Sequence, residues 1–269
     1  MAIAKTSSAK KTAEKNQERK KRRGAFLAVF LILLFSALAG SSLFFLRKVL
    51  FLNKPRLTLQ KIRVSGTGYW KTHPVQFIQT TGLQKGSSLF GLDLSQLRSQ
   101  INHISNIENC SVRRVLPDTL VIEVTERVPR AVLGDQRSPW VLDTDTVVMA
   151  RNQVMSHAGR LPEIIGISLS GVRDGEKLEK ARCAVDLIMM TVRSFPDLKI
   201  YRISLKDPEK MDILLQYRKF SITRVLIPVK NRGLSFMLMA LQSAIIHARQ
   251  IGETRNFYDL SYDGKVVIR

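Results

Sequence analysis

CSVRRVLPDTLVIEVTER, residues 110–127, predicts two strands joined by a tight turn. The turn is Pro117-Asp118: proline presets its own φ, and an aspartate side chain can bond to the nearby backbone. In the second strand apolar and polar positions alternate, with Leu120, Ile122 and Val124 on one side and Val121, Glu123 and Thr125 on the other. Alternation of this kind is typical of a half-buried strand. The stretch therefore predicts a β-hairpin with one face in a core.

Upstream of the hairpin the sequence predicts one strand and two helices. LTLQKIRV, residues 57–64, alternates like a strand, with Leu57, Leu59, Ile62 and Val64 as its buried positions. His73-Pro74 opens a short helix that ends at Gly82, because proline suits a first helical turn and glycine suits a helix end. Asp93 caps a second helix, LSQLRSQINHI, whose apolar face is Leu94, Leu97, Ile101 and Ile104. The predicted order is strand, helix, loop, helix, strand, strand.

The loop between the two helices, GLQKGSSLFGLD (residues 82–93), is rich in glycine and could be taken for a phosphate-binding loop. A P-loop needs four residues between its glycines and a lysine after the second one. Here three residues separate Gly82 from Gly86, and Lys85 precedes Gly86. SGTGYWK, residues 65–71, fails the dinucleotide pattern as well, because Lys71 stands where the third glycine belongs. Neither loop predicts a nucleotide site.

An uncharged stretch of 23 residues, Gly24 to Leu46, predicts a transmembrane helix. At about 1.5 Å per residue it is long enough for a hydrocarbon core of about 30 Å. The alternative is a cleaved signal peptide, because Ala37-Leu38-Ala39 before Gly40 has the form of a cleavage site. The apolar stretch continues past that point to Leu46, which favours an uncleaved span.

The charge distribution predicts the orientation of that span. Residues 1–23 form a basic tail that ends in KNQERKKRRG (15–24), which favours a cytoplasmic N-terminus and an exported remainder. The formal net charge of the chain is +21. The excess of basic over acidic residues is seven in each of the ranges 1–23, 47–128 and 129–269. A spread-out charge argues against a nucleic-acid site, which concentrates charge on one face beside aromatic residues.

These features together resemble the FtsQ/DivIB family of bacterial cell-division proteins and its polypeptide-transport-associated (POTRA) domain. The resemblance is carried by KIRVSG, TGLQKGSSLFGLDLSQL and NCSVRRVLPDTLVIEVTERVPRAVL. It implies an α+β protein with one N-terminal transmembrane helix, a POTRA domain (β-α-α-β-β) over residues 57–128 and a mixed β domain with two helices over residues 129–269. In this reading the glycine-rich loop is a structural connection, with Leu89, Phe90 and Leu92 filling the core.

The second domain is expected to begin with a hairpin, RAVL and WVLDTDTVVM, that bends at Asp143 to Thr146. LPEIIG, IYRISL, MDILLQYR and SITRVLIP predict further short strands. GEKLEKARCAVDLIMMTVRSF predicts a helix that buries Leu178, Ala181, Val185, Ile188, Val192 and Phe195. LSFMLMALQSAIIHARQI predicts another that buries Leu234, Met237, Leu241, Ala244 and Ile245. NFYDLSYDGKVVIR resembles the closing strands of the family.

The sequence contains no recognisable catalytic or metal-binding set. His73, His103, His157 and His247 have no neighbour at a metal-ligand spacing, and GISLSG (166–171) is one residue too long for a nucleophile elbow. Asp143 and Asp145 fit a turn better than an acid–base pair. Cys110 and Cys183 could pair if exported, or could be two small buried side chains. No enzyme activity, cofactor, small-molecule substrate or nucleic-acid partner is expected.

The resemblance implies a non-enzymatic scaffold at the division site of the inner membrane. The implied partner is an FtsB/FtsL-type protein, with FtsK, FtsW and FtsI-like proteins as further partners. Family partner-binding positions fall on Tyr262 and Gly264, and the strand Lys265, Val266, Val267, Ile268 is expected at a sheet edge open to strand addition. The family arginine before that tyrosine is Ser261 here, and the turn is one residue shorter. A membrane-anchored cell-wall enzyme and a POTRA-type secretion or assembly factor are the alternatives.

Overall fold

The computed structural model describes residues 34–38, 40–42, 44–46, 58–154, 160–230, 233–253, 255–262 and 265–268. The chain divides into two compact units. One comprises Met1–Gln60, Lys85–Leu92 and Leu116–Asp118, and the other Lys61–Gln84, Asp93–Val115 and Thr119–Arg269. The domains expected from the sequence, 57–128 and 129–269, are a different division of the chain and stay a prediction.

Most of the predicted transmembrane stretch, Gly24 to Leu46, lies outside the described residues. Its described parts, 34–38, 40–42 and 44–46, are helical. Their large apolar side chains are exposed, with Phe35 at 76% and Phe44 at 72%. Within the described parts of the chain, no helix is both long enough and apolar enough to cross a membrane.

In the first unit, backbone hydrogen bonds join three separate stretches. The Leu59 N–H donates to Ser87 O (2.9 Å), and Gln60 N–H donates to Asp118 O (2.9 Å). Leu89 has no exposed surface, but Phe90 is 38% exposed, so the expectation that Phe90 fills the core is wrong. Leu89 and Phe90 are the two central residues of a turn in which the Gly91 N–H donates to the Ser88 carbonyl oxygen. Neighbouring side chains in such a turn point in different directions. Leu92, expected to be buried, is half-buried.

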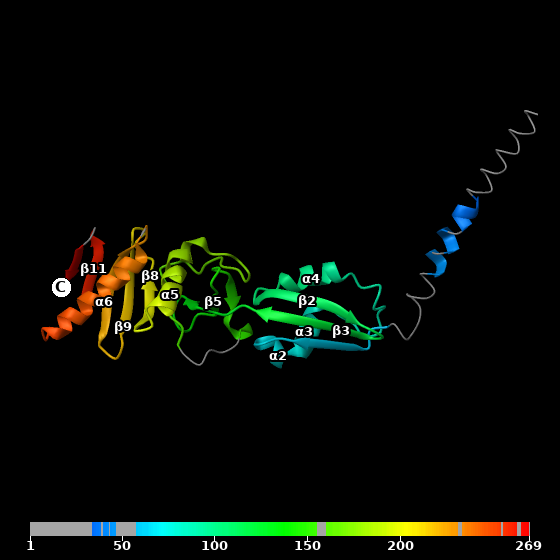
Figure 1. The fold of residues 1–269 in the computed structure, drawn as a ribbon, viewed down its shortest axis with the longest axis horizontal. Coiled ribbons are helices and arrows are strands. Elements are labelled where there is room, and N and C mark those ends of the chain that lie inside the picture. Colours follow the sequence, from blue (N-terminus) through cyan, green and yellow to red (C-terminus); the bar gives the residue numbers. More distant parts are fainter. Residues whose placement is uncertain are drawn as a thin grey trace, which may run out of the picture. The chain divides into compact units, whose positions relative to one another are not determined.

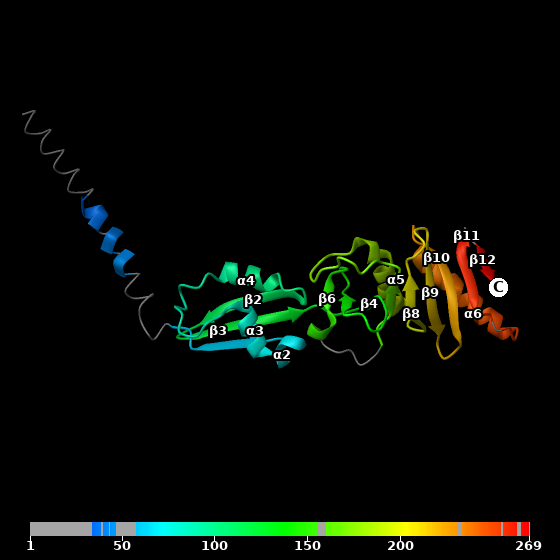
Figure 2. The ribbon, with the colours of Figure 1, turned by 180° about the vertical axis from the view of Figure 1, so that it is seen from behind.

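A three-stranded sheet with three helices forms the first part of the second unit (Figures 1 and 2). Its strands are β1 (Lys61–Ser65), β2 (Ile107–Val115) and β3 (Thr119–Glu126), in the order β1-β3-β2. β1 runs parallel to β3, and β2 antiparallel to it. The helices are α2 (Tyr69–Thr72), α3 (Pro74–Thr81) and α4 (Leu94–Asn102). The predicted hairpin and its buried face are confirmed, since Leu120, Ile122 and Val124 are at most 5% exposed.

The helix boundaries follow the local signals. The Asp93 carboxylate accepts the N–H groups of Ser95 and Gln96 at 2.8 and 3.1 Å, which confirms the predicted cap of α4. Gly82 ends α3 with φ +65°, a left-handed conformation that glycine adopts without strain.

The remaining strands form one nine-stranded sheet. They are β4 (Ala131–Leu133), β5 (Trp140–Leu142), β6 (Val148–Ala150), β7 (Glu163–Ile165), β8 (Leu198–Ser204), β9 (Lys210–Tyr217), β10 (Ile222–Pro228), β11 (Phe257–Tyr262) and β12 (Lys265–Ile268). The order is β12-β11-β10-β9-β8-β7-β4-β5-β6. Short 3-10 turns lie at Arg151–Gln153 and Glu179–Ala181. Every strand predicted for this part of the chain is present.

Two helices, α5 (Arg182–Ser194) and α6 (Leu234–Gln250), cover the same face of this sheet (Figures 1 and 2). Both contribute to one apolar core with the strands, for example Val185 and Leu187 from α5 and Leu241 from α6. The expectation that Val192 is buried is wrong, because its side chain is 63% exposed. Thr191 is buried in its place and bonds to the Leu187 carbonyl, so the buried stripe runs one position earlier on the last turn of α5.

Candidate functional site

The strand predicted as a partner-binding edge is present as β12, at one end of the nine-stranded sheet. β12 pairs antiparallel with β11, with Tyr258 opposite Ile268 and Asp259 opposite Val267. No further strand pairs with the outer side of β12 among the described residues. An edge strand of this kind presents a row of backbone N–H and C=O groups, onto which another strand can be added.

The opposite end of the sheet, β6, is closed by the chain itself. The Val148 N–H donates to Glu176 O, and Gly175 N–H donates to Val148 O, both at 2.8 Å. The Ala150 N–H donates to the Asp174 carboxylate at 3.1 Å. The loop around Gly175 therefore uses the backbone groups of β6 that a partner strand would need. Of the two ends of this sheet, β12 is the one with no such cover in the described part of the chain.

A β-bulge lies in β11 next to the site. Between the pairs Asp259–Val267 and Tyr262–Lys265, β11 has one residue more than β12. The Asp259 carboxylate accepts the backbone N–H of Ser261 at 2.9 Å and also the Ser261 hydroxyl. Ser261 stands where the sequence analysis expected the family arginine. Its hydrogen bonds to Asp259 hold the backbone of the bulge. The sequence analysis missed this feature, although Asp-x-Ser is a known local turn signal.

The predicted site residues are partly described. Tyr262 ends β11 with 54% of its side chain exposed, and the Lys210 ammonium lies 5.8 Å from the centre of its ring. Val267 is half-buried in β12. Gly264 lies outside the described residues, as do the side chains of Lys265, Val266 and Ile268. The predicted alternation of their side chains along β12 stays a prediction.

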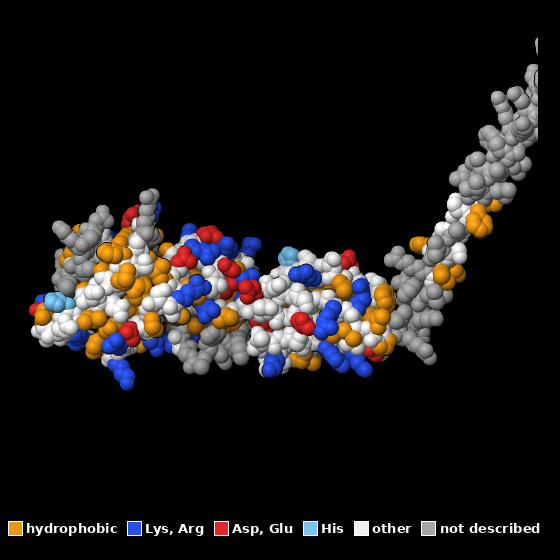
Figure 3. All heavy atoms as spheres, viewed as in Figure 1, with side chains coloured by type: hydrophobic (Ala, Val, Ile, Leu, Met, Phe, Trp, Pro, Cys, Tyr) orange, Lys and Arg blue, Asp and Glu red, His pale blue; other side chains and the backbone are white. Residues whose placement is uncertain are grey.

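An apolar stripe on the outer side of α6 was not expected. Phe236, Met239 and Ile246 are 64%, 52% and 38% exposed, and Figure 3 shows apolar side chains gathered over this helix. Among the residues expected to be buried, Leu241 and Ile245 have at most 3% exposure, and Leu234, Met237 and Ala244 pack partly against the core. Phe236, Met239 and Ile246 are three and seven residues apart, a helical spacing. This spacing could have indicated from the sequence a second apolar stripe, on the side of α6 away from the sheet.

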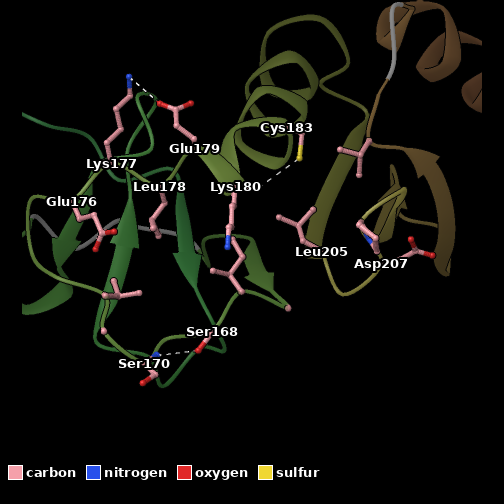
Figure 4. A pocket seen from close by; sticks show the side chains of 16 residues that line it. Ser168, Ser170, Glu176, Lys177, Leu178, Glu179, Lys180, Cys183, Leu205 and Asp207 are labelled. Carbon is pink, nitrogen blue, oxygen red and sulfur yellow. Dashed lines mark hydrogen bonds and ion pairs between the residues drawn. The ribbon is translucent and has the colours of Figure 1, made fainter.

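A cavity of about 760 Å³ lies beside α5 (Figure 4). It is lined by residues from the segments 166–172 and 176–180, and by Cys183, Leu205, Asp207, Pro208 and Val229. Its charged lining is mixed: Lys177 pairs with Glu179 at 3.3 Å, and Glu176, Lys180 and Asp207 are nearby. No group of three or more His, Cys, Asp or Glu side chains that could hold a metal ion occurs in the described ranges. The half-buried Cys183 thiol also lines the cavity, and its Sγ lies 4.0 Å from the Lys180 carbonyl oxygen.

The candidate acid–base residues are structural. The Asp143 carboxylate accepts the N–H groups of Asp145 and Val147, both at 2.8 Å, and contacts the Arg127 guanidinium at 2.7 Å. This confirms that Asp143 forms the predicted turn. Cys110 and Cys183 are both free thiols, so the reading of them as a pair is wrong for this structure. Burial raises the pKa of each thiol.

A buried carboxylate, Glu163, lies in β7 in the middle of the sheet. It is 2% exposed and contacts Arg160 at 2.7 Å and Arg202 at 2.6 Å. Burial alone would raise its pKa, but the hydrogen bonds from Arg160 and Arg202 outweigh burial, and the pKa of Glu163 lies below its ordinary value. Since one carboxylate faces two guanidinium groups, this cluster keeps a net positive charge.

Comparison with known proteins identifies the strand–helix–helix–hairpin region. Residues 57–127 match the family model described as "POTRA domain, FtsQ-type". The FtsQ cell division protein of Corynebacterium glutamicum is 31% identical over 91 residues, which cover 34% of this chain and 40% of the relative. The DivIB cell division protein of Clostridium acetobutylicum is 23% identical over 218 residues, which cover 81% of this chain and 85% of the relative. The chain thus carries a POTRA domain of FtsQ type and is similar to the FtsQ/DivIB cell division proteins.

These matches confirm the resemblance to FtsQ/DivIB that was drawn from the sequence. The FtsQ protein of Novosphingobium aromaticivorans adds 36% identity over 98 residues. The matches span only 40% and 28% of the length of the C. glutamicum and N. aromaticivorans relatives. The match to the DivIB protein of C. acetobutylicum covers more of this chain than the two FtsQ matches do, but at a lower sequence identity. The FtsQ/DivIB assignment thus rests most firmly on the POTRA region.

Proposed function

We propose that this protein is a non-enzymatic, single-pass membrane scaffold of the bacterial division machinery, and that it binds an FtsB/FtsL-type partner by strand addition to β12. The observation that carries the proposal is the difference between the two ends of the nine-stranded sheet: β6 is covered by the loop around Gly175, whereas β12 is the last strand. Tyr262, half-exposed where β11 ends, is the proposed side-chain anchor. Gly264 to Ile268 form the rest of the proposed site.

The membrane part of the proposal uses the predicted span Gly24–Leu46, with residues 1–23 in the cytoplasm and the rest outside it. It is supported by the absence of charge over 23 residues and by the exposed phenylalanines at 35, 44 and 45. The domains 57–128 and 129–269 are proposed as the two exported parts. FtsK, FtsW and FtsI-like proteins are proposed as further partners at the division site.

The test of strand addition is a pair of proline variants in β12, measured in the full-length protein with a purified FtsB/FtsL-type complex. Backbone N–H groups alternate in direction along a strand, so one of Val266 and Val267 points its N–H outward and the other toward β11. Proline removes the N–H in each case. One variant is expected to lose partner binding while keeping the fold, and the other to destabilise the sheet.

Val267→Thr is the matched control, because it keeps the β propensity and the backbone N–H of this position. We expect its partner affinity to stay within about threefold of the unsubstituted protein, well below the tenfold that about 1.4 kcal/mol would produce. Circular dichroism and thermal unfolding report the fold of each variant. If both proline variants keep the fold and bind the partner normally, β12 is not the binding edge.

A further inference from the structure

A second cleft, separate from β12, lies beside the last turns of α5. It has a volume of about 410 Å³, within the usual range for ligand sites. Its walls come from the chain before β4, the chain before β7, the C-terminal half of α5 and the start of β8. The lining residues that bear on binding are Arg130, Arg160, Ile188, Val192, Leu198 and Lys199.

The charged part of this lining is entirely basic. Arg130, Arg160 and Lys199 contribute to it, and no aspartate or glutamate does. Arg160 contacts Glu163, but that carboxylate is shared with Arg202 and cannot neutralise both guanidinium groups. The cleft therefore attracts an anionic group, and among the described residues its lining contains no carboxylate.

One donor of Arg130, a residue that lines the cleft, has no acceptor. The Nε atom of Arg130 is buried and has no hydrogen-bond partner in the described part of the structure. The Arg130 backbone is fixed beside it, because its N–H donates to Leu142 O at 2.7 Å. A buried donor without an acceptor is unfavourable, and a guanidinium is suited to a carboxylate, which can accept two parallel hydrogen bonds. The Nε atom is itself inaccessible, so an incoming carboxylate would act on the positive charge of the guanidinium that lines the cleft.

The rest of the cleft is apolar. Ile188 and Leu198 are buried residues of its lining. Val192, also in the lining, is 63% exposed, although Ile188 on the preceding turn of α5 is in the core. Pro129, Pro162 and Pro196 complete the apolar lining. A ligand that fits therefore carries an apolar group next to its carboxylate.

We propose that this cleft binds an extended peptide segment of a partner protein, in which a glutamate or aspartate next to an aliphatic residue contacts Arg130. The aliphatic side chain lies against Val192 and Leu198. Nucleic acid fits poorly, since the lining has no aromatic side chain on which a base could stack. A lipid surface favours clustered exposed cations, whereas the Arg130 Nε is recessed. The proposal goes beyond β12 and does not depend on strand addition.

The test measures peptide binding to the full-length protein in detergent by fluorescence anisotropy. The probe is a fluorescein-labelled peptide of sequence Gly-Val-Glu-Leu-Gly, and its neutral counterpart carries glutamine in place of glutamate. The neutral peptide is expected to bind about tenfold more weakly, because a charge-assisted hydrogen bond is lost. Arg130→Gln and Lys199→Gln are each expected to weaken binding of the acidic peptide and to leave the neutral peptide unaffected.

Two controls separate this site from other effects. Arg193→Gln removes an exposed charge next to Val192 that is not part of the lining, so it should leave binding unchanged. The β12 proline variant that keeps its fold should bind the peptide normally. Equal binding of both peptides, or an equal loss with Arg130→Gln and Arg193→Gln, would overturn the proposal. Displacement of the peptide by phosphatidylglycerol vesicles, but not by phosphatidylcholine vesicles, would assign the cleft to lipid instead.

Discussion

Glu126 accepts a hydrogen bond from the backbone N–H of Trp70 at 2.9 Å, across 56 positions of sequence. The same carboxylate accepts the N–H groups of Gly68 (3.1 Å) and Tyr69 (2.6 Å), so it holds three consecutive amides at the start of α2. The Trp70 indole in turn donates to Asn106 at 2.9 Å and packs edge-on against Phe77. The end of β3 thereby positions α2 and the aromatic core above the sheet.

Glu126→Ala is expected to destabilise the protein by about 3 kcal/mol, because it leaves three amide N–H groups without their acceptor. The measurement is urea unfolding, followed by Trp70 fluorescence in a Trp140→Phe background. The control is Glu123→Ala on the same strand. Its carboxylate is 52% exposed and pairs with an exposed Arg113, so the loss there should stay below about 1 kcal/mol. Equal effects of the two substitutions would contradict the capping role.

Leu89→Ala is expected to cost about 3 kcal/mol, since it removes a fully buried side chain. Phe90→Ala should cost less than about 1 kcal/mol, because Phe90 is exposed in the same turn. Lys85→Ala, on the exposed part of the loop, should have no measurable effect on stability. Thermal unfolding of the three variants side by side measures the difference. A larger loss of stability with Phe90→Ala than with Leu89→Ala would contradict the finding that Leu89, and not Phe90, is the buried residue.

Tyr262→Ala is expected to weaken binding of an FtsB/FtsL-type partner about tenfold, as an exposed aromatic anchor would. The melting temperature should change little, because the ring is half-exposed. Phe90→Ala, at an exposed aromatic residue far along the sequence, serves as the control and should bind normally. Unchanged affinity of the Tyr262 variant would remove this residue from the proposed site.

The stabilising effect of Glu163 is expected to depend on pH. Its pKa lies lower in the folded protein than the reference value of 4.5. A lowered pKa means that the carboxylate stabilises the fold above the unfolded pKa, and that this contribution is lost as the pH falls through the folded pKa. The gap in melting temperature between the unsubstituted protein and Glu163→Gln should be large at pH 7 and shrink below pH 4.5. A gap that is constant or grows on acidification would contradict this sign.

The proposed topology predicts that a periplasmic reporter fused after Arg269 is active outside the cytoplasm. The same reporter fused before Gly24 should be inactive, because the basic tail stays inside. Sequencing of the mature N-terminus provides the second measurement. A chain that begins at Gly40 would show that the apolar stretch is a cleaved signal peptide.

Much of the local structure could be predicted because it depends on neighbours along the chain. The alternation of Leu120, Ile122 and Val124 defined the inner face of β3, and Asp93 capped α4 as expected. The failures fall where a residue meets the rest of the fold. Val192 has helical spacing from Ile188, yet the sheet contacts the side of α5 that carries Thr191. Likewise, a turn has no periodicity from which the sequence could show that Leu89 is buried and Phe90 is exposed.

The sequence by itself determined the POTRA-type order of elements and the position of the last strand, because these follow from short-range periodicity, caps and turns. Tertiary structure alone decided which sheet edge is covered. β6 is closed by Gly175 and Glu176, some 27 residues away from Val148, whereas β12 is the last strand of its sheet. It also decided that Glu126 caps α2 and that Arg130 has a buried donor without an acceptor. Such pairings depend on strand order and register across the whole sheet, which local sequence patterns do not encode.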